Sequence, residues 1–157
     1  MGSKLNDLAL LLLRLSGLAM AFYHGQGKVA SLASGEGERL IQGAADIGFP
    51  FPVVFAWAAA LAEFAGGLMI AVGLGTRIAS GFVAFTMVVA AFGRHRAFHQ
   101  LLVGLGIMNV DAETVKSWGK PESALIYLVT CLALVLTGAG RYSLDRLLAK
   151  RSRPSKD

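Results

Sequence analysis

Cysteine and charge are both scarce in this chain. The single cysteine, Cys131, excludes an internal disulfide, and the sequence has no CxxC dithiol, haem-attachment motif or zinc ligand set. No glycine-rich phosphate loop follows a strand pattern. Charged residues make up 16% of the 157 residues, whereas soluble domains usually carry about 25%. These absences argue against a disulfide-stabilised secreted domain, a zinc or haem protein and a phosphate-loop enzyme.

The few charges are also segregated along the chain. Glu63 is the only charged residue between positions 48 and 75, and the stretches 78–93 and 123–140 contain none. Hydrophobic residues make up 55% of the sequence, and the mean hydropathy is +0.58. Because a membrane-spanning helix needs roughly 20 apolar residues, several such segments predict an all-α, polytopic membrane protein. We expect a four-transmembrane-helix bundle with two long outer loops.

The predicted spans are set by apolar runs and by proline and glycine. They cover residues 5–23, 53–74, 78–94 and 121–138 of a single membrane domain over residues 1–157. Pro52 and Pro121 suit the starts of the second and fourth spans, and glycines after Thr137 suit the end of the fourth. In the long loops, the segment 37–49 is predicted as a short amphipathic helix, and the segment 96–108 either as another or as an extension of the third span.

The net charge of +5 reflects a basic tail over residues 141–157. In a membrane protein, Lys and Arg next to a span indicate a cytoplasmic flank rather than a nucleic-acid surface. We therefore predict no nucleic-acid partner and place both termini in the cytoplasm, with the chain in a cytoplasmic (inner) membrane. Both long loops then lie on the outer face.

Two opposite charges interrupt the first two predicted spans. At 1.5 Å per residue, Arg14 lies about 14 Å from the inner face and Glu63 about 16 Å from the outer face. The hydrocarbon core is about 30 Å thick, so both side chains reach a similar depth from antiparallel helices. We predict an Arg14–Glu63 ion pair there, because an unpaired charge costs at least about 2.5–3.5 kcal/mol. Whether such a pair acts on a substrate or only fixes helix register stays open.

The three histidines all fall at the predicted outer face. His24 ends the first span, and His95 and His99 follow the third, with Lys28 nearby. A protonatable vestibule above an apolar bundle suits an amphipathic ring such as a quinone headgroup, because histidine donates to a carbonyl and exchanges protons near neutral pH. Two alternatives stay open. The segment "RHR" at 94–96 is also typical of a charge cluster that contacts lipid phosphates, and i,i+4 histidines also occur as metal ligands.

Several short motifs, in order along nearly the whole chain, resemble the DoxX family. They are "RL" at 14–15, "HGQGK" at 24–28, "GFP" at 48–50 and "GAGRYSLD" at 138–145. Between the last two lies a spaced motif made of Glu63, Gly66, Gly67, Gly73, Leu74, Thr76 and Arg77. The resemblance implies a small four-helix bacterial membrane protein. The family is named after a subunit of a thiosulfate:quinone oxidoreductase, and some members belong to membrane redox complexes. It also implies that Asp145 pairs with Arg77 or Arg141 and fixes the cytoplasmic end of the bundle.

These observations give one leading hypothesis and two alternatives. The leading one is a quinone-interacting subunit of a membrane oxidoreductase complex, with quinone as the cofactor. Its predicted catalytic residues are Arg14, Glu63 and His24. Its predicted cofactor-binding residues are His24, Lys28, His95 and His99, with no metal site. The alternatives are a non-catalytic assembly or scaffold subunit and a carrier of a small amphipathic molecule. Besides the lipid bilayer, the expected partner is a redox protein or a second copy of the chain.

Overall fold

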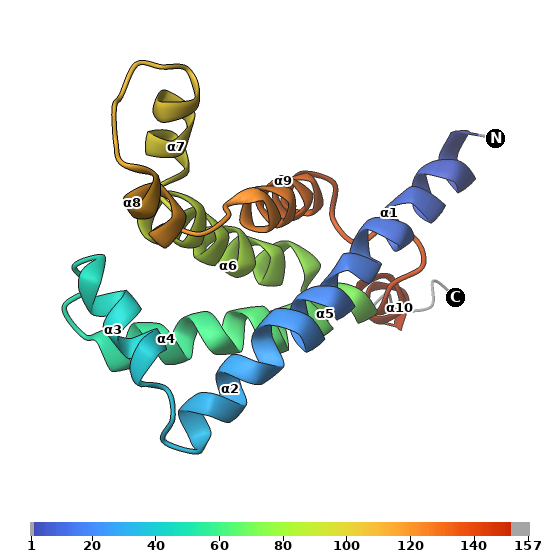
Figure 1. Ribbon diagram of the computed structural model, residues 1–157. Coiled ribbons are helices and arrows are strands. Elements are labelled where there is room, and N and C mark those ends of the chain that lie inside the picture. Colours follow the sequence, from blue (N-terminus) through green and yellow to red (C-terminus); the bar gives the residue numbers. More distant parts are fainter. Residues whose placement is uncertain (1, 152–157) are drawn as a thin grey trace, which may run out of the picture.

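The structure, a computed structural model, describes residues 2–151 as a bundle of helices (Figure 1). No strand occurs within that range. In chain order the segments are α1 (Gly2–Ala19), η1 (Met20–Gly25), α2 (Gln26–Ala33), α3 (Glu38–Asp46), α4 (Pro52–Leu61), η2 (Ala62–Gly66), α5 (Gly67–Val72), α6 (Thr76–Val88), η3 (Val89–Arg94), α7 (Ala97–Gly104), α8 (Ala112–Ser117), α9 (Glu122–Thr137) and α10 (Leu144–Arg151). Each η segment is π-helical; η1 and η2 join the helices on both sides without a break, and η3 continues α6, so the chain forms fewer, longer helices than these labels suggest.

Three of these continuous helices are long and apolar enough to cross a membrane. They run over Lys4–Ala33, Pro52–Val72 and Thr76–Arg94, and α9 is a shorter apolar helix of 16 residues. Large apolar side chains point outward, among them Leu12, Phe82 and Leu136, which are 60%, 64% and 77% exposed. A helical protein with a surface of this kind matches lipid rather than water. The prediction of an all-α membrane bundle is confirmed.

The first helix is longer than the sequence predicts. It was expected to end at residue 23 but continues through the polar "HGQGK" segment to Ala33. Thirty residues at 1.5 Å each span about 45 Å, more than the hydrocarbon core of about 30 Å. The polar end of this helix therefore extends beyond the apolar region, which explains why hydropathy alone placed its end too early.

Glycines bring the first two long helices into direct backbone contact. A Cβ atom on Gly17 would lie 2.4 Å from the Gly67 carbonyl oxygen, and one on Gly25 would lie 2.4 Å from the Phe64 nitrogen. Small residues allow such close approach in membrane helices, where apolar burial alone does not hold helices together. The crossing fixes which residues of the two helices face each other.

The start of α1 and helix α10 lie at one end of the bundle, where the segment after α9 is fixed by hydrogen bonds (Figure 1). Asp145 accepts hydrogen bonds from the Gly75 and Thr76 backbone N–H groups at 2.6 and 3.0 Å. It therefore caps the start of α6 and does not pair with Arg77, which donates to the Leu136 carbonyl at 3.2 Å. The motif does fix this end of the bundle, but through the backbone, because the free N–H groups of a helix start favour a carboxylate. The predicted basic tail contains α10, and residues 152–157 lie outside the described part.

The opposite end carries the two long connections. They contain α3 and α7, which confirm the short helices predicted in segments 37–49 and 96–108, and α8, which was not predicted. In Figure 1, α4 and α6 diverge toward this end, with α3 beside α4 and with α7 and α8 beyond the end of α6. The functional residues discussed below gather between these two groups.

Candidate functional site

A buried ion pair joins the first two long helices. Lys28 Nζ lies 2.6 and 2.7 Å from the two carboxylate oxygens of Glu63. The Glu63 side chain is 2% exposed, whereas that of Lys28 is 34% exposed. The carboxylate is therefore buried inside the bundle, while the side chain of its lysine partner is partly exposed. A lysine ammonium has three N–H donors, and Glu63 accepts two of them.

The predicted Arg14–Glu63 pair is wrong, because the two residues lie at different heights. Glu63 lies beside Gly25, whereas Arg14 lies against Gly73, where an added Cβ would overlap its guanidinium. Ten residues separate Glu63 from Gly73 (73 − 63), or about 15 Å along a helix. Arg14, 1% exposed, instead donates to the Tyr142 carbonyl. The prediction assumed that the first two spans begin and end at the same heights in the membrane. The long first helix does not share those heights, so the inferred equal depths of Arg14 and Glu63 were wrong.

Irregular helix geometry coincides with the charged groups. The three π-helical segments contain His24 in η1, Glu63 in η2 and Arg94 in η3. A π-helical turn holds an extra residue and rotates the side chains that follow it, and such turns are frequent at functional sites. Segments η1 and η2 pack against each other where Gly25 meets Phe64. This contact positions Lys28, one turn beyond Gly25, over the Glu63 carboxylate.

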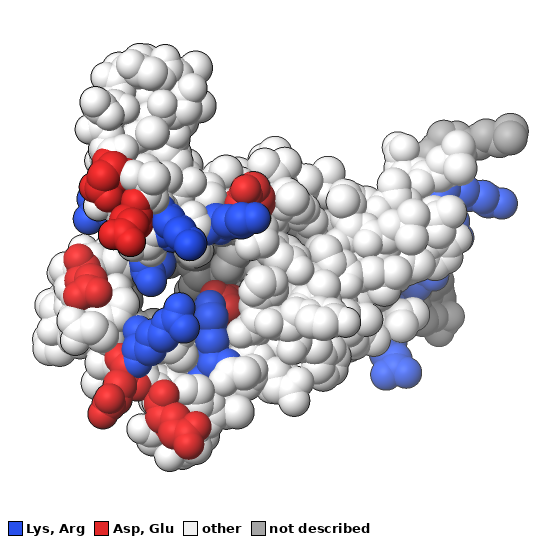
Figure 2. All heavy atoms as spheres, viewed as in Figure 1, with Lys and Arg blue, Asp and Glu red and all other residues white. Residues whose placement is uncertain are grey.

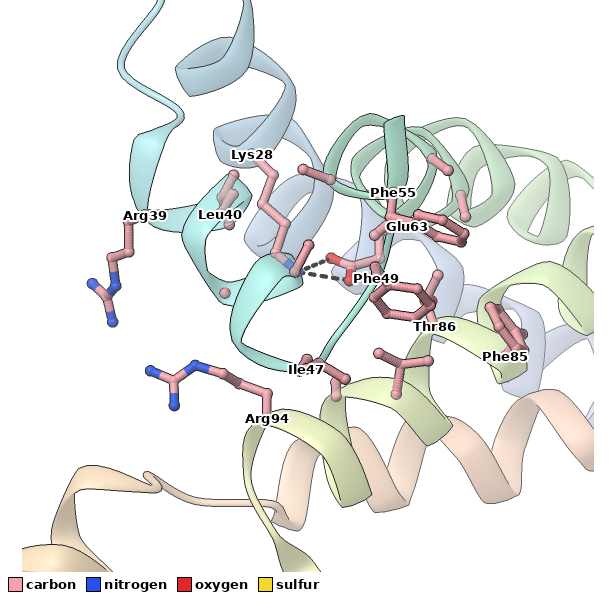
Figure 3. Close-up of a pocket in the computed structure, with 18 of the residues that line it drawn as sticks. Lys28, Arg39, Leu40, Ile47, Phe49, Phe55, Glu63, Phe85, Thr86 and Arg94 are labelled. Carbon is pink, nitrogen blue, oxygen red and sulfur yellow. Dashed lines mark hydrogen bonds and ion pairs between the residues drawn. The ribbon is translucent and has the colours of Figure 1, made fainter. Parts of the chain in front are cut away.

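The ion pair lies in the wall of a cleft of about 700 Å³ between α3, α4 and α6 (Figure 3). Most of its lining is apolar, and Phe49 and Phe55 stack there with ring centroids 4.1 Å apart and planes at 21°. The other apolar side chains of the lining include Leu40, Ile47, Phe82, Phe85 and Val89. This combination of aromatic walls and a few polar groups is typical of a site for an amphipathic small molecule.

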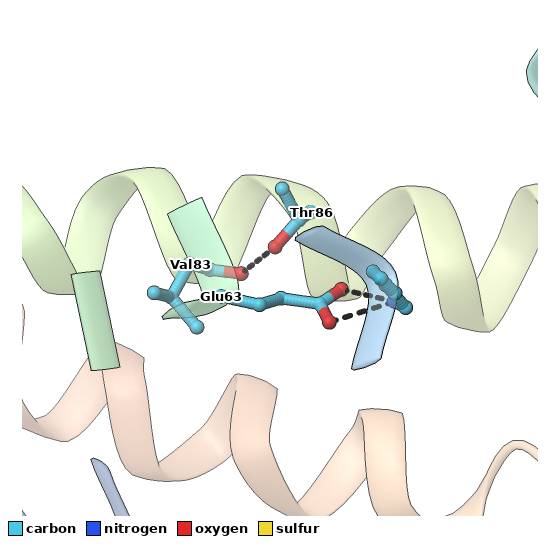
Figure 4. A network of polar contacts seen from close by, with 4 residues as sticks. Glu63, Val83 and Thr86 are labelled. Atoms are coloured by element: carbon cyan, nitrogen blue, oxygen red, sulfur yellow. Dashed lines mark hydrogen bonds and ion pairs between the residues drawn. The ribbon is translucent and has the colours of Figure 1, made fainter. Parts of the chain in front are cut away.

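Thr86 lies on the α6 side of the cleft, near Glu63 (Figure 4). Its hydroxyl donates to the Val83 carbonyl at 2.8 Å rather than to the carboxylate. The dashed lines at the carboxylate in Figure 4 mark the two bonds from Lys28. Within the described part of the chain, the Glu63 carboxylate therefore accepts hydrogen bonds from Lys28 alone and forms its ion pair with the same residue.

The histidines are divided between the cleft and its surroundings. His95 lines the cleft, and its Nδ1 lies 2.7 Å from the Trp118 carbonyl oxygen. His99 packs edge-on against the Trp118 ring at 6.0 Å, and His24 packs against Tyr127 of α9 at 5.4 Å. Neither of these two lines the cleft. Of the predicted site residues, the structure thus brings together Lys28, Glu63 and His95, and separates Arg14, His24 and His99 from them.

Two arginines that were not predicted as site residues lie at the mouth of the cleft. Arg39 belongs to α3, and Arg94 is the last residue of η3 (Figure 3). In Figure 2, basic side chains surround a hollow on this end of the molecule, with an acidic side chain inside it. The sequence carries a signal for Arg39, since the segment that forms α3 is amphipathic. Which long helix α3 covers depends on tertiary packing, and the amphipathic pattern does not specify it. No group of three or more His, Cys, Asp or Glu suited to a metal occurs within the described residues.

Comparison with known proteins identifies similar membrane proteins. The family model described as DoxX matches residues 9–96, more than half of the chain. The chain is also similar to the inner membrane protein YqjF of Escherichia coli strain K12. The two are 31% identical over 148 residues, which covers 94% of this chain and 98% of that protein. No solved structure matches the chain.

Proposed function

The chain belongs to the DoxX family, and we propose that it is an inner-membrane subunit that binds a quinone in the cleft beside the Lys28–Glu63 pair. The observation that supports this proposal best is the donor that Lys28 retains. Glu63 accepts two of its three N–H bonds, and the ammonium group lines the cleft. A quinone carbonyl is an acceptor without charge, so it suits the remaining N–H. The inner-membrane location is supported by the name of the Escherichia coli relative.

The walls of the cleft suit the rest of such a ligand. The stacked rings of Phe49 and Phe55 offer a flat apolar surface to a planar headgroup. The cleft also includes Phe82 and Phe85, which are largely exposed on the outer surface of α6. A prenyl tail can therefore leave the cleft sideways between α4 and α6 and remain in lipid. In this proposal the electrons come from a partner oxidoreductase, and this chain supplies the binding site.

Retention of quinone by the purified protein tests the proposal. We expect quinone to co-purify with the wild-type chain in mild detergent and to be identified in the organic extract by mass spectrometry. The double substitution Lys28→Met/Glu63→Leu removes both charges, so no unpaired charge is left behind, and it should reduce retained quinone at least tenfold. Lys4→Met, at the opposite end of the same helix, is the matched control and should retain wild-type levels. Equal quinone in the folded double variant and in the control would contradict the proposal.

A second candidate function is the assembly of a redox complex, and α7 favours it. This helix stands away from the rest of the bundle in Figure 1 and exposes Phe98 and Leu101. Exposed apolar patches of this kind mark contacts with protein or lipid. Replacing both residues with serine should release a co-purifying protein without affecting retained quinone. If the partner stays attached after this change, the assembly function of α7 is wrong.

A further inference from the structure

Two charges at the mouth of the cleft have no partner among the residues that the structure describes. Arg39 and Arg94 line the cleft and are exposed, and neither guanidinium group forms an ion pair or hydrogen bond within the range 2–151. Lys28 differs from them, because both of its bonds go to Glu63. The two arginines come from elements far apart in the sequence, α3 and η3, and Figure 3 shows both guanidinium groups on the same side of the cleft.

The charge of the lining sets the charge of the occupant. Lys28 and Glu63 neutralise each other, which leaves Arg39 and Arg94 against the single carboxylate of Glu36. Two positive charges minus one negative charge leave one positive charge on the Lys, Arg and Glu side chains of the lining. A phosphodiester carries one negative charge and offers oxygen atoms that match the forked N–H donors of arginine.

The remainder of the lining identifies the rest of the occupant. Behind the two arginines the cleft is lined by Ile47, Phe85 and Val89, and it reaches the exposed Phe82 on the outer surface of α6. A free inorganic phosphate would leave this apolar surface uncovered, whereas an acyl chain would cover it. The combination of a basic rim with an apolar slot between two membrane helices therefore matches a lipid.

We propose that the mouth of the cleft binds an anionic phospholipid, with its phosphate held by Arg39 and Arg94 and an acyl chain on the apolar lining next to them, at Ile47 and Val89. The site lies at the rim, whereas the proposed quinone site lies at the Lys28–Glu63 pair in the wall. The lipid site does not depend on quinone binding. The two proposals therefore fail separately.

Lipid retention measured by native mass spectrometry tests this site. The full chain is purified in detergent and titrated with dioleoyl phosphatidylglycerol, which is anionic, or with dioleoyl phosphatidylcholine, which is zwitterionic. We expect wild-type protein to retain the anionic lipid about tenfold better. The double substitution Arg39→Gln/Arg94→Gln should abolish this preference. Arg141→Gln/Arg146→Gln removes the same charge at the other end of the bundle and should keep the preference.

The control measurements decide between the possible sources of the effect. Circular dichroism and a single melting transition establish that each variant is folded before lipid is added. An unchanged preference in the folded Arg39→Gln/Arg94→Gln protein would overturn the proposal, as would an equal loss in the Arg141→Gln/Arg146→Gln control. Inorganic phosphate should not displace the bound lipid at equal concentration. Displacement would show a phosphate site without lipid specificity and would also overturn the proposal.

Discussion

Lys28 and Glu63 stabilise each other only as long as both charges are present. Removing Lys28 alone leaves a carboxylate that is 2% exposed without a counter-charge. Breaking a buried pair in this way typically costs about 3–5 kcal/mol, and the partial exposure of Lys28 favours the lower end. We expect Lys28→Met to lower the free energy of unfolding by about 3 kcal/mol. Denaturation in mixed detergent micelles, followed by circular dichroism, measures this change.

The double variant separates a structural role of the pair from a binding role. Replacing both members of a buried pair with apolar residues is often neutral or stabilising, so Lys28→Met/Glu63→Leu should unfold within about 1 kcal/mol of wild type. A stable double variant that has lost quinone indicates that the pair serves binding. A double variant as unstable as Lys28→Met would contradict the prediction and indicate that the pair is needed for folding.

The sequence predicted which charged side chains are buried, but it did not predict their partners. Arg14 and Glu63 are both buried as expected, because a charge within an apolar span is stable only on an inward face. Their partners depend on how far one helix slides along the other. That register is set at Gly17, Gly25 and Gly67, where backbones touch, and hydropathy carries no information about it.

At the scale of helices, Gly25 is the position that holds η1 against η2. A Cβ atom there would lie 2.4 Å from the Phe64 nitrogen and 2.8 Å from the Glu63 carbonyl carbon. Both neighbours are backbone atoms, so the helices must move apart. We expect Gly25→Ala to cost about 1–3 kcal/mol and to reduce retained quinone, because Lys28 moves with the helix.

Gly27 provides the matched control for this prediction. An added Cβ there meets nothing within 4 Å, although Gly27 also lines the cleft. Gly27→Ala should therefore keep or slightly raise the free energy of unfolding, since alanine favours helix over glycine by up to about 1 kcal/mol. If both variants behave alike in micelle denaturation, the backbone contact at Gly25 does not hold the helices together.

Helix α8 depends on a carboxylate cap and should respond to acid. The Thr114 backbone N–H donates to Asp111 at 2.8 Å, and hydrogen bonds from Thr114 lower the pKa of Asp111. A lowered pKa means that the cap contributes fully above the ordinary Asp value of about 3.9 and is lost as pH falls through the lowered value. We expect hydrogen-exchange protection of the α8 amides, relative to those of α9, to fall over this acidic range. Asp111→Ala should show low protection at every pH, and a pH-independent wild type would contradict the prediction.

The sequence was informative about most helices and less so about this outer end. Segments 37–49 and 96–108 were predicted as helices from their amphipathic pattern, and α3 and α7 are found there. Helix α8 was missed, although Asp111 followed three residues later by Thr114 is a typical N-cap arrangement. The cleft was not predictable, because Arg39 and Arg94 come to line it only through the packing of α3 against α4 and of Ile47 beside Gly93.

For the whole molecule, the direction of insertion in the membrane decides which leaflet supplies lipid or quinone to the cleft. The start of α1 and helix α10 lie at one end and the cleft at the other, so a single accessible position at each end is sufficient to determine the orientation (Figure 1). Ser34, after α2, and Lys150, in α10, are both exposed. The only cysteine, Cys131, is buried and is replaced by alanine to provide a background without thiols.

We expect Ser34→Cys to react with a membrane-impermeant maleimide in intact spheroplasts, and Lys150→Cys to react only after the membrane is permeabilised. The physical reason is the basic tail, since Lys and Arg next to a span are retained on the cytoplasmic side. This result would place the Arg39–Arg94 rim in the outer leaflet and the proposed quinone site near the periplasmic surface. The reverse labelling pattern would contradict the prediction. The rim would then meet the cytoplasmic leaflet, and any redox partner bound at this end would be a cytoplasmic protein.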